Sequence, residues 1–159
     1  MPGTETTWLT PAAHAKLVEE LEHLTTTGRQ EISERIAEAR SHGDIRENAD
    51  YDAAKNEQGM MEARIRQIQH ILDTAEVREA AATDSVEVGS IVEIEREDGS
   101  KMEVFVAPRE NKVDELVLAS PTSPLGGALL GRAAGDEVEY SAPSGPTRVT
   151  VVSIRPFEG

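Results

Sequence analysis

Cysteine is absent from the sequence, which excludes disulfide bonds, thiolate metal sites and cysteine nucleophiles. Aromatic residues are scarce, with one Trp, two Tyr and two Phe, so a core must be built from aliphatic side chains. Basic residues are outnumbered, and the formal net charge of −14 opposes binding to bare nucleic acid, because phosphate contacts need clustered Lys and Arg. These deficits argue against a free-standing DNA-binding protein.

Long apolar runs are also missing. No stretch approaches the length of a membrane span, and the N-terminal sequence MPGTETTW lacks the basic and apolar regions of a signal peptide. We therefore expect a cytoplasmic protein without membrane contacts. A hydrophobic content of 38% is enough for a modest core, in one ordinary domain or two small ones.

The first half of the chain has the pattern of two amphipathic helices. Thr10 followed by Pro11 is a typical helix start, and Trp8 just before it is expected to act as a hydrophobic staple or an interdomain contact. A first apolar stripe follows, and residues 25–28 leave open whether this helix is interrupted. The first stripe consists of Leu17, Leu21, Leu24, Ile32, Ile36 and Ala39. The second, spaced by three and four residues, is a heptad seam of Tyr51, Ala54, Gln58, Met61, Ile65, Ile68, Leu72 and Ala75.

The segment SHGDIREN between the two stripes is short, so the helices must run antiparallel. Each arm has about 30 residues and a length of roughly 45 Å. The tip at residues 43–48 cannot be buried by its own chain, and it is therefore presented to water or to another molecule.

The second half reads as short strands. Alternating apolar residues predict strands near residues 90–95, 102–106, 115–119, 137–140 and 147–154, with a short helix at 125–130. The fold class is therefore α+β. It comprises a long antiparallel coiled-coil hairpin in residues 1–79, a linker in 80–88 and a small antiparallel sheet domain with a short helix in 89–159.

Two carboxylates stand at the hairpin tip. Asp44 and Glu47 have the spacing of a helix capping box, and on spacing alone a cap is the simpler interpretation. Position gives a second interpretation, because Mg²⁺ commonly takes one or two protein carboxylates and fills its other sites with water and phosphate. Two acids carried to a site that already holds a metal and a phosphodiester can support metal-assisted hydrolysis. Both interpretations can hold together.

Two motifs resemble those of a known family. The stretch GDIRENADYDAAKNEQG, residues 43–59, is similar to the tip signature of the Gre transcript-cleavage factors, and SPLGGALLG, residues 123–131, resembles their second signature. The order of the remaining segments matches the family over nearly the whole chain. Lys55, Arg64 and Arg66 lie among many acids, whereas the GreB branch has a basic patch along its coiled coil, so the resemblance is to the GreA branch.

This resemblance implies an accessory factor that is not itself an enzyme. Gre factors have an N-terminal coiled coil and a C-terminal domain like the FKBP prolyl isomerases, and they bind the secondary channel of bacterial RNA polymerase. By resemblance, Asp44 and Glu47 would act in trans as catalytic and Mg²⁺-binding residues for cleavage of backtracked RNA by the polymerase. No cofactor is bound tightly, the Mg²⁺ is shared, and the nascent RNA 3′ end is contacted indirectly. Ser123, Pro124 and Leu125 would contact the channel rim, and the factor is expected to be a monomer.

Two alternatives remain open at this point. Some Gre homologues with additional tip acids inhibit the polymerase, and Asp50 and Asp52 add such charge here, although first-turn acids also suit a helix dipole. A coiled-coil adaptor without a role in cleavage is the other alternative. A prolyl isomerase is less favoured, because few aromatics are available to line its pocket.

Overall fold

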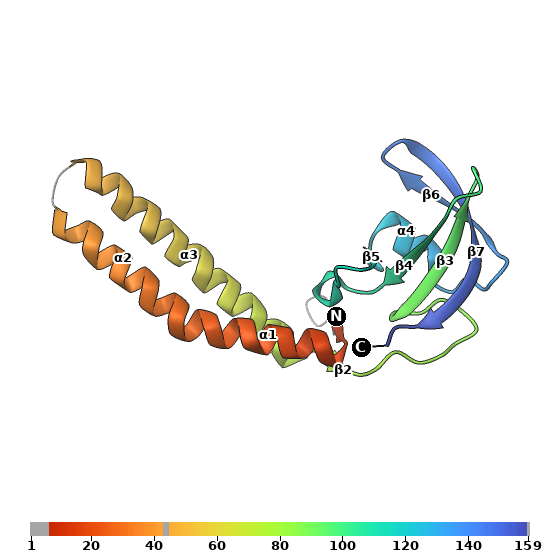
Figure 1. Ribbon diagram of the computed structural model, residues 1–159, viewed down its shortest axis with the longest axis horizontal. Helices are drawn as coiled ribbons and strands as arrows, with labels where there is room; N and C mark the ends of the chain where they lie inside the picture. The colour runs from red at the N-terminus through yellow and green to blue at the C-terminus, as the bar shows by residue number, and fades with distance from the viewer. Residues whose placement is uncertain (1–6, 43–44, 159) are drawn as a thin grey trace. The chain divides into compact units, whose positions relative to one another are not determined.

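The protein folds into two compact units. The computed structural model describes residues 7–42 and 45–158, and only the backbone at residues 42 and 45–48. Among the described residues, the first unit contains residues 14–74 and the second contains 7–13 and 75–158. The first is helical, whereas the second is built on sheets (Figure 1). The predicted α+β class is confirmed.

The helical unit is a hairpin of two arms. The first arm runs through helix α1 (Pro11–His23), the π-helix η1 (Leu24–Gly28) and helix α2 (Arg29–His42). The second arm is helix α3 (Ile45–Thr74), which lies beside the first (Figure 1). Buried residues of the seam are Leu17, Ile32, Ala39, Ala54, Ile65, Ile68 and Ile71. The apolar stripes therefore meet as the heptad spacing predicts.

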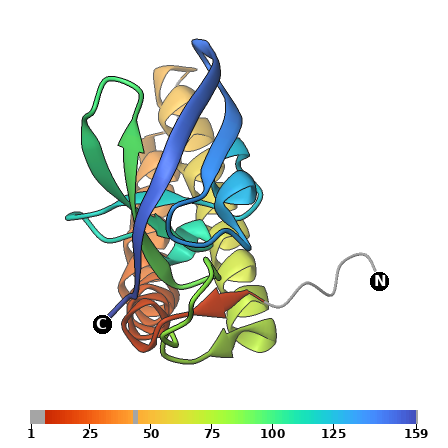
Figure 2. The same cartoon turned by 90° about the vertical axis from the view of Figure 1, so that its right-hand side faces the viewer.

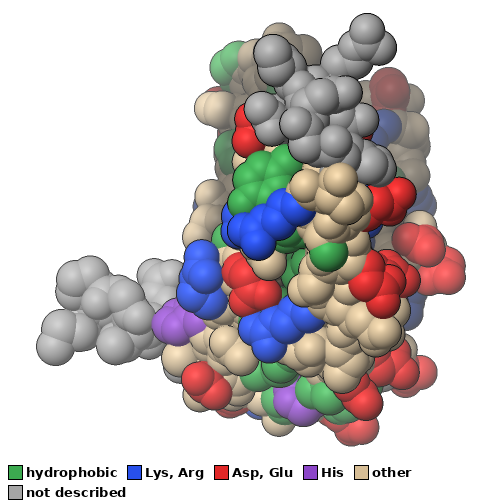
Figure 3. Space-filling view, turned by 90° about the vertical axis from the view of Figure 1, so that its left-hand side faces the viewer, with side chains coloured by type: hydrophobic (Ala, Val, Ile, Leu, Met, Phe, Trp, Pro, Cys, Tyr) green, Lys and Arg blue, Asp and Glu red, His purple; other side chains and the backbone are tan. Residues whose placement is uncertain are grey.

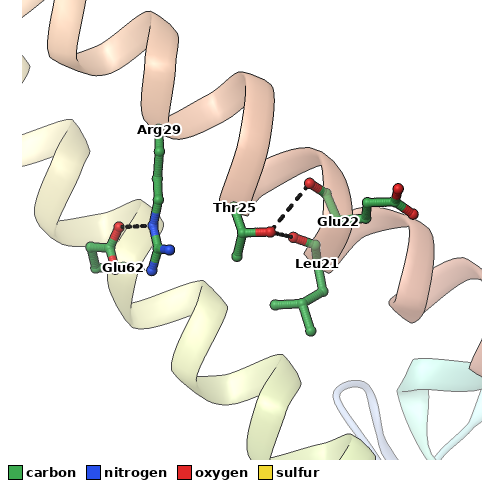
Figure 4. A network of polar contacts seen from close by, with 5 residues as sticks. All are labelled: Leu21, Glu22, Thr25, Arg29 and Glu62. Carbon is green, nitrogen blue, oxygen red and sulfur yellow. Dashed lines mark hydrogen bonds and ion pairs between the residues drawn. The ribbon is translucent and has the colours of Figure 1, made fainter.

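The first arm is bent into a π turn but is not broken. Its apolar positions 17, 21 and 24 would continue at 28, 31, 35 and 38, yet the large residues that follow are Ile32 and Ile36. A π turn takes in one additional residue, which restores the alignment of the stripe with the other arm. The Thr25 hydroxyl donates to the Leu21 carbonyl at 2.8 Å, within the turn (Figure 4). The open question about residues 25–28 is thus answered by a local change of helix type.

The larger sheet of the second unit has five strands in the order β5-β4-β3-β7-β6 (Figure 2). These are β3 (Ser90–Arg96), β4 (Lys101–Val106), β5 (Val117–Ala119), β6 (Glu137–Ala142) and β7 (Gly145–Pro156). Three of the four pairings are antiparallel, but β5 pairs with β4 in parallel. This pairing differs from the antiparallel expectation, because the connection from β4 includes a 3₁₀ helix η2 (Arg109–Asn111) and re-enters the sheet in the same direction.

One face of this sheet packs under helix α4 (Pro124–Leu129). Leu129 is fully buried against valines and an isoleucine of the strands. Successive side chains of strand β3 point to opposite faces of the sheet, so Val92 and Ile94 join this core whereas Glu93 and Glu95 do not. The buried set is Val86, Val92, Ile94, Val104, Val106, Ala119, Leu129, Val138, Val149 and Val151.

A smaller aromatic cluster contains the N-terminal strand. Strand β1 (Trp8–Leu9) pairs in parallel with β2 (Glu76–Val77), and Trp8 packs with Ile91, Phe105 and Ala107. The Trp8 and Phe105 rings meet edge to face, with centroids 6.4 Å apart. Residues 7–13, which the sequence analysis placed with the hairpin, therefore belong to the sheet unit.

Asn111 holds this N-terminal segment. It is 1% exposed, and its Oδ1 accepts from the Thr10 backbone N–H at 2.8 Å. Its Nδ2 donates to the carbonyls of Trp8 at 2.9 Å and Pro108 at 3.1 Å. Thr10 in turn caps α1, because its Oγ1 accepts from the Ala13 N–H at 3.0 Å.

Candidate functional site at the end of the hairpin

Helix α2 of the first arm ends at His42, and helix α3, the second arm, begins at Ile45. Glu47 falls in the first turn of α3 by its backbone, but its side chain lies outside the described part of the structure. Asp44 lies outside the described residues altogether. The catalytic and Mg²⁺-binding roles expected of Asp44 and Glu47 therefore stay predictions, as does the capping box.

The seam nearest this end is built from small residues. Ala39 on α2 and Ala54 on α3 are buried, at 8% and 2% exposure. A shallow cleft of ≈ 290 Å³ lies beside them, lined by Arg35, Glu38, Ala39, Asp50, Ala53 and Ala54. Farther along α3 the seam uses Ile65 and Ile68 instead. Among the described residues, the apolar area buried between the arms near this end is therefore small, since alanine buries little area.

A polar and aromatic contact joins the arms at this point. Arg40 of α2 donates from Nη2 to the Tyr51 hydroxyl of α3 at 3.3 Å, and its Cζ lies 5.5 Å from the ring centroid. This hydrogen bond, followed by the positive charge of Arg40, lowers the pKa of Tyr51 below its ordinary value. The half-buried Tyr51 is thus both a seam residue and the acceptor of a contact between the arms.

Ion pairs join the arms along the rest of the hairpin. Arg29 binds Glu62 at 2.9 Å (Figure 4), Arg64 binds Glu20 at 2.7 Å, and Arg35 pairs with Glu57. The hydrogen bond from Arg64 lowers the pKa of Glu20, and that from Arg29 lowers the pKa of Glu62.

Basic and acidic side chains accordingly intermingle on the face of the molecule seen from the end of the hairpin (Figure 3). Arg29 and Arg64 face acids of the opposite arm rather than forming a basic stripe with their neighbours. This distribution agrees with the net charge and with the expectation that the hairpin itself is poorly suited to bare nucleic acid.

Metal-binding groups are sparse in the described part of the chain. Within it, no three His, Asp or Glu side chains gather closely enough to hold a metal ion. No helix in residues 7–42 and 45–158 is long and apolar enough to cross a membrane.

The second signature has a clear structural role in the sheet unit. Ser123 caps α4, since its Oγ accepts from the Gly126 N–H at 3.1 Å and donates to the Ser120 carbonyl at 2.6 Å. Pro124 occupies the first helical position and is exposed, whereas Leu125 is half-buried against the sheet core. A role of Ser123, Pro124 and Leu125 in partner binding stays a prediction, and Pro124 is the member most available for it.

Gly126 is required by a close approach of backbone. A Cβ added there would lie 1.9 Å from the Ser120 carbonyl oxygen, which no side chain tolerates. The glycine of the signature is therefore explained by the packing of α4 on its preceding loop.

The sequence analysis missed two residues. Arg40 carried a signal, because it precedes Asp44 by four residues just as Tyr51 follows Glu47 by four. Asn111 carried none, because its bonds to Thr10 and Trp8 span about a hundred positions and depend on the folded sheet.

Comparison with known proteins gives a consistent assignment. Residues 7–77 match the family model described as transcription elongation factor, N-terminal, and residues 81–156 match that of transcription elongation factor, GreA/GreB, C-term. Transcription elongation factor GreA of Streptomyces coelicolor is 43% identical over 157 residues, which cover 96% of this chain and 95% of that protein. GreA of Rhodococcus erythropolis is 44% identical over 163 residues, covering 99% of each chain.

Among solved structures, the chain is similar to GreA factor homolog 1 (Gfh1) of Thermus thermophilus, with 30% identity and a TM-score of 0.45. That match covers 95% of this chain and 99% of the other. The resemblance inferred from the two signatures is confirmed by the family models and by the full-length relatives. The chain therefore belongs to the GreA/GreB family of transcription elongation factors, and its similarity is to the GreA members.

Proposed function

We propose that this elongation factor binds bacterial RNA polymerase at its secondary channel and stimulates the polymerase's own Mg²⁺-dependent cleavage of backtracked nascent RNA. Cleavage leaves a new RNA 3′ end in the active site and so rescues arrested complexes. The factor contributes ligands and is not an enzyme on its own. Membership of the family supports this proposal, as do the paired arms of the hairpin.

The observation that carries the proposal is the extent of helix α3. It runs without a break for 30 residues from Ile45, which corresponds to about 45 Å of helix. Helix α2 of the first arm, which ends at His42, packs against it. The segment that carries Asp44 and Glu47 therefore connects two paired helices, which is the arrangement that the proposal needs.

The donor chemistry at this end fits Mg²⁺. Asp44 and Glu47 offer carboxylate oxygens, which are the ligands that Mg²⁺ prefers, and two are a usual protein contribution. When bound, the ion would help to generate the attacking hydroxide and stabilise the leaving oxygen. The residues of this chain then have two tasks: the acids supply part of a ligand set completed by the polymerase, and the arms hold them in place.

Contact with the polymerase outside the channel is assigned to the sheet unit. The Ser123 cap and the Gly126 approach fix the start of α4, and this leaves Pro124 exposed. Proline presents its surface at little entropic cost on binding, because its ring already fixes the backbone. We assign the rim contact to Pro124 and the half-buried Leu125 on this basis.

The test uses a stalled, backtracked elongation complex with Mg²⁺ and labelled RNA. The wild-type chain is expected to shorten the RNA, while Asp44→Ala and Glu47→Ala abolish most of the stimulation and leave polymerase binding intact. Asp52→Ala is the matched control, because this exposed acid lies on the same helix beyond the tip and is expected to retain activity.

Four results separate the candidates. Full stimulation by an Asp44→Ala, Glu47→Ala double variant would show that the tip assignment is wrong. If the acids only cap the helix, activity would follow helix stability, which a lost cap lowers by about 1 kcal/mol. Blocked RNA extension without shortening by the wild type would identify an inhibitor, and no effect on the RNA would identify an adaptor.

A further inference from the structure

Among the described side chains near the end of the hairpin, the buried ones are small. Ala39 and Ala54 are the buried seam residues there, and a cleft opens beside them. Two carboxylates that share one ion need a defined separation, because a ligand displaced by an ångström loses much of its contribution. Some other contact must therefore fix the spacing of the arms close to the tip.

The Arg40–Tyr51 contact has the right position for this role. Arg40 lies four residues before Asp44, and Tyr51 lies four residues after Glu47. Four residues are about one turn of helix, or about 6 Å of rise, so the backbones of Glu47 and Tyr51 stand one turn apart on α3, and Arg40 lies in the last turn of α2. Tyr51 also shares a face of α3 with the backbone of Glu47, because residues at i and i+4 lie on the same side.

The contact is also suited to hold a distance. The guanidinium both donates to the phenol oxygen at 3.3 Å and lies 5.5 Å from the ring centroid, so two different interactions restrain one pair. Tyr51 has few rotatable bonds and is half-buried at the start of the seam. A rigid aromatic side chain thus replaces the apolar packing that isoleucines provide farther along α3.

We propose that Arg40 and Tyr51 form a positioning pair, which fixes the separation of the two arms at the tip and thereby the joint metal binding of Asp44 and Glu47. This inference rests on the proposed function and adds to it. The pair is not catalytic, since its role is exerted through the two acids. Its loss should therefore weaken Mg²⁺ use more than maximal cleavage or polymerase binding.

The experiment measures stimulated RNA cleavage as a function of Mg²⁺ concentration, and reports the half-saturating concentration and the maximal rate separately. Tyr51→Ala and Arg40→Gln are expected to raise the half-saturating Mg²⁺ by about tenfold, as the loss of supporting contacts does in metal sites. Tyr51→Phe keeps the ring and loses the hydroxyl, so its shift should be smaller. The double variant should be no worse than the more affected single variant, because the two residues act as a unit.

The matched control is Arg35→Gln. It removes the exposed cross-arm pair with Glu57, which lies farther from the tip. The half-saturating Mg²⁺ concentration of this variant should stay within about twofold of the wild-type value, since a solvent-exposed ion pair contributes little to stability. Helix content by circular dichroism and polymerase binding by competition are measured for every variant.

The outcomes are distinct. Equal Mg²⁺ dependence for Arg40→Gln, Tyr51→Ala and Arg35→Gln would overturn the positioning role while leaving the proposed function intact, provided the wild type shortens RNA. Additive effects of Arg40 and Tyr51 would also overturn it. A wild type that does not shorten RNA would refute the proposed function, and the inference with it.

Discussion

Replacing Asn111 by alanine tests how the N-terminal segment is held in the sheet unit. Asn111 makes three hydrogen bonds from a buried position, two of them to residues 8 and 10 about a hundred positions away in sequence. Alanine removes both the acceptor and the donor. The Thr10 N–H and the Trp8 carbonyl then lose this partner in a region where Trp8 is 4% and Thr10 3% exposed.

The expected loss follows from these two groups. Leaving one buried polar group without a partner costs about 1–3 kcal/mol, so the pair costs about 2–6 kcal/mol of the stability of this segment. The Pro108 carbonyl contributes little to the loss, because it still accepts from the Asn111 backbone N–H at 3.0 Å. The loss should lie at the lower end of this range if water enters the site and forms hydrogen bonds with the Thr10 N–H and the Trp8 carbonyl.

The single tryptophan provides the assay. Trp8 is the only one in the chain, so its emission and its quenching by acrylamide report on this segment alone. In urea, the Trp8 transition of Asn111→Ala should move to lower concentration, and quenching should rise even without denaturant. Far-UV circular dichroism follows the hairpin in the same samples.

Asn56→Ala is the control, because Asn56 is exposed on α3 and makes no comparable buried contact. It should leave the Trp8 transition unchanged. A change of less than about 0.5 kcal/mol for Asn111→Ala, the range of ordinary surface substitutions, together with unaltered quenching, would refute the reasoning.

Further predictions concern backbone packing and pH. Gly126→Ala should destabilise the sheet unit by about 1–3 kcal/mol or more, because its Cβ would collide with the Ser120 carbonyl, whereas Gly59→Ala should stabilise the hairpin by about 0.5–1 kcal/mol, because that helical position is open. Urea unfolding followed by Trp8 fluorescence measures the first effect, and unfolding followed by far-UV circular dichroism measures the second. A change of stability in the same direction for both variants would contradict the prediction. Bonds from arginines lower the pKa of Glu20 and of Glu62, so the stability that these acids add is present above their unfolded pKa of about 4.3 and is lost as pH falls through the lower folded values. Hairpin melting temperature should therefore fall below about pH 4, and less so in Glu20→Gln or Glu62→Gln.

The sequence predicted the helical hairpin well because its signal is periodic and local. Spacings of three and four along residues 51–75 describe α3, and the strands of the sheet followed from the alternation of apolar residues. For residues 25–28 the sequence left open whether the first helix is interrupted, and the π turn was not predicted. Its cause, one surplus residue in the stripe, is visible in the sequence, but the choice between a break and a π turn depends on packing against the other arm.

The remaining differences arise from contacts between distant positions. No local sequence pattern predicts that β5 pairs in parallel with β4 or that Trp8 packs against Phe105. At the candidate site, motifs led to Asp44, Glu47 and the Ser-Pro loop, whereas the Arg40–Tyr51 contact needed the two arms to be paired first. Composition alone suggested the mixed charges of the hairpin, but not which acid faces which arginine.

The parallel pairing of β1 with β2 makes the hairpin an insertion. Two parallel strands cannot be joined by a tight turn and need a long crossover, and here the whole pair of arms serves as that crossover. Reach and attachment are thereby separable: removing one heptad from each arm would shorten the rod by about 10 Å while leaving both strand partners unchanged. A series of variants with arms shortened by one heptad at a time would therefore measure how long the hairpin must be for its function.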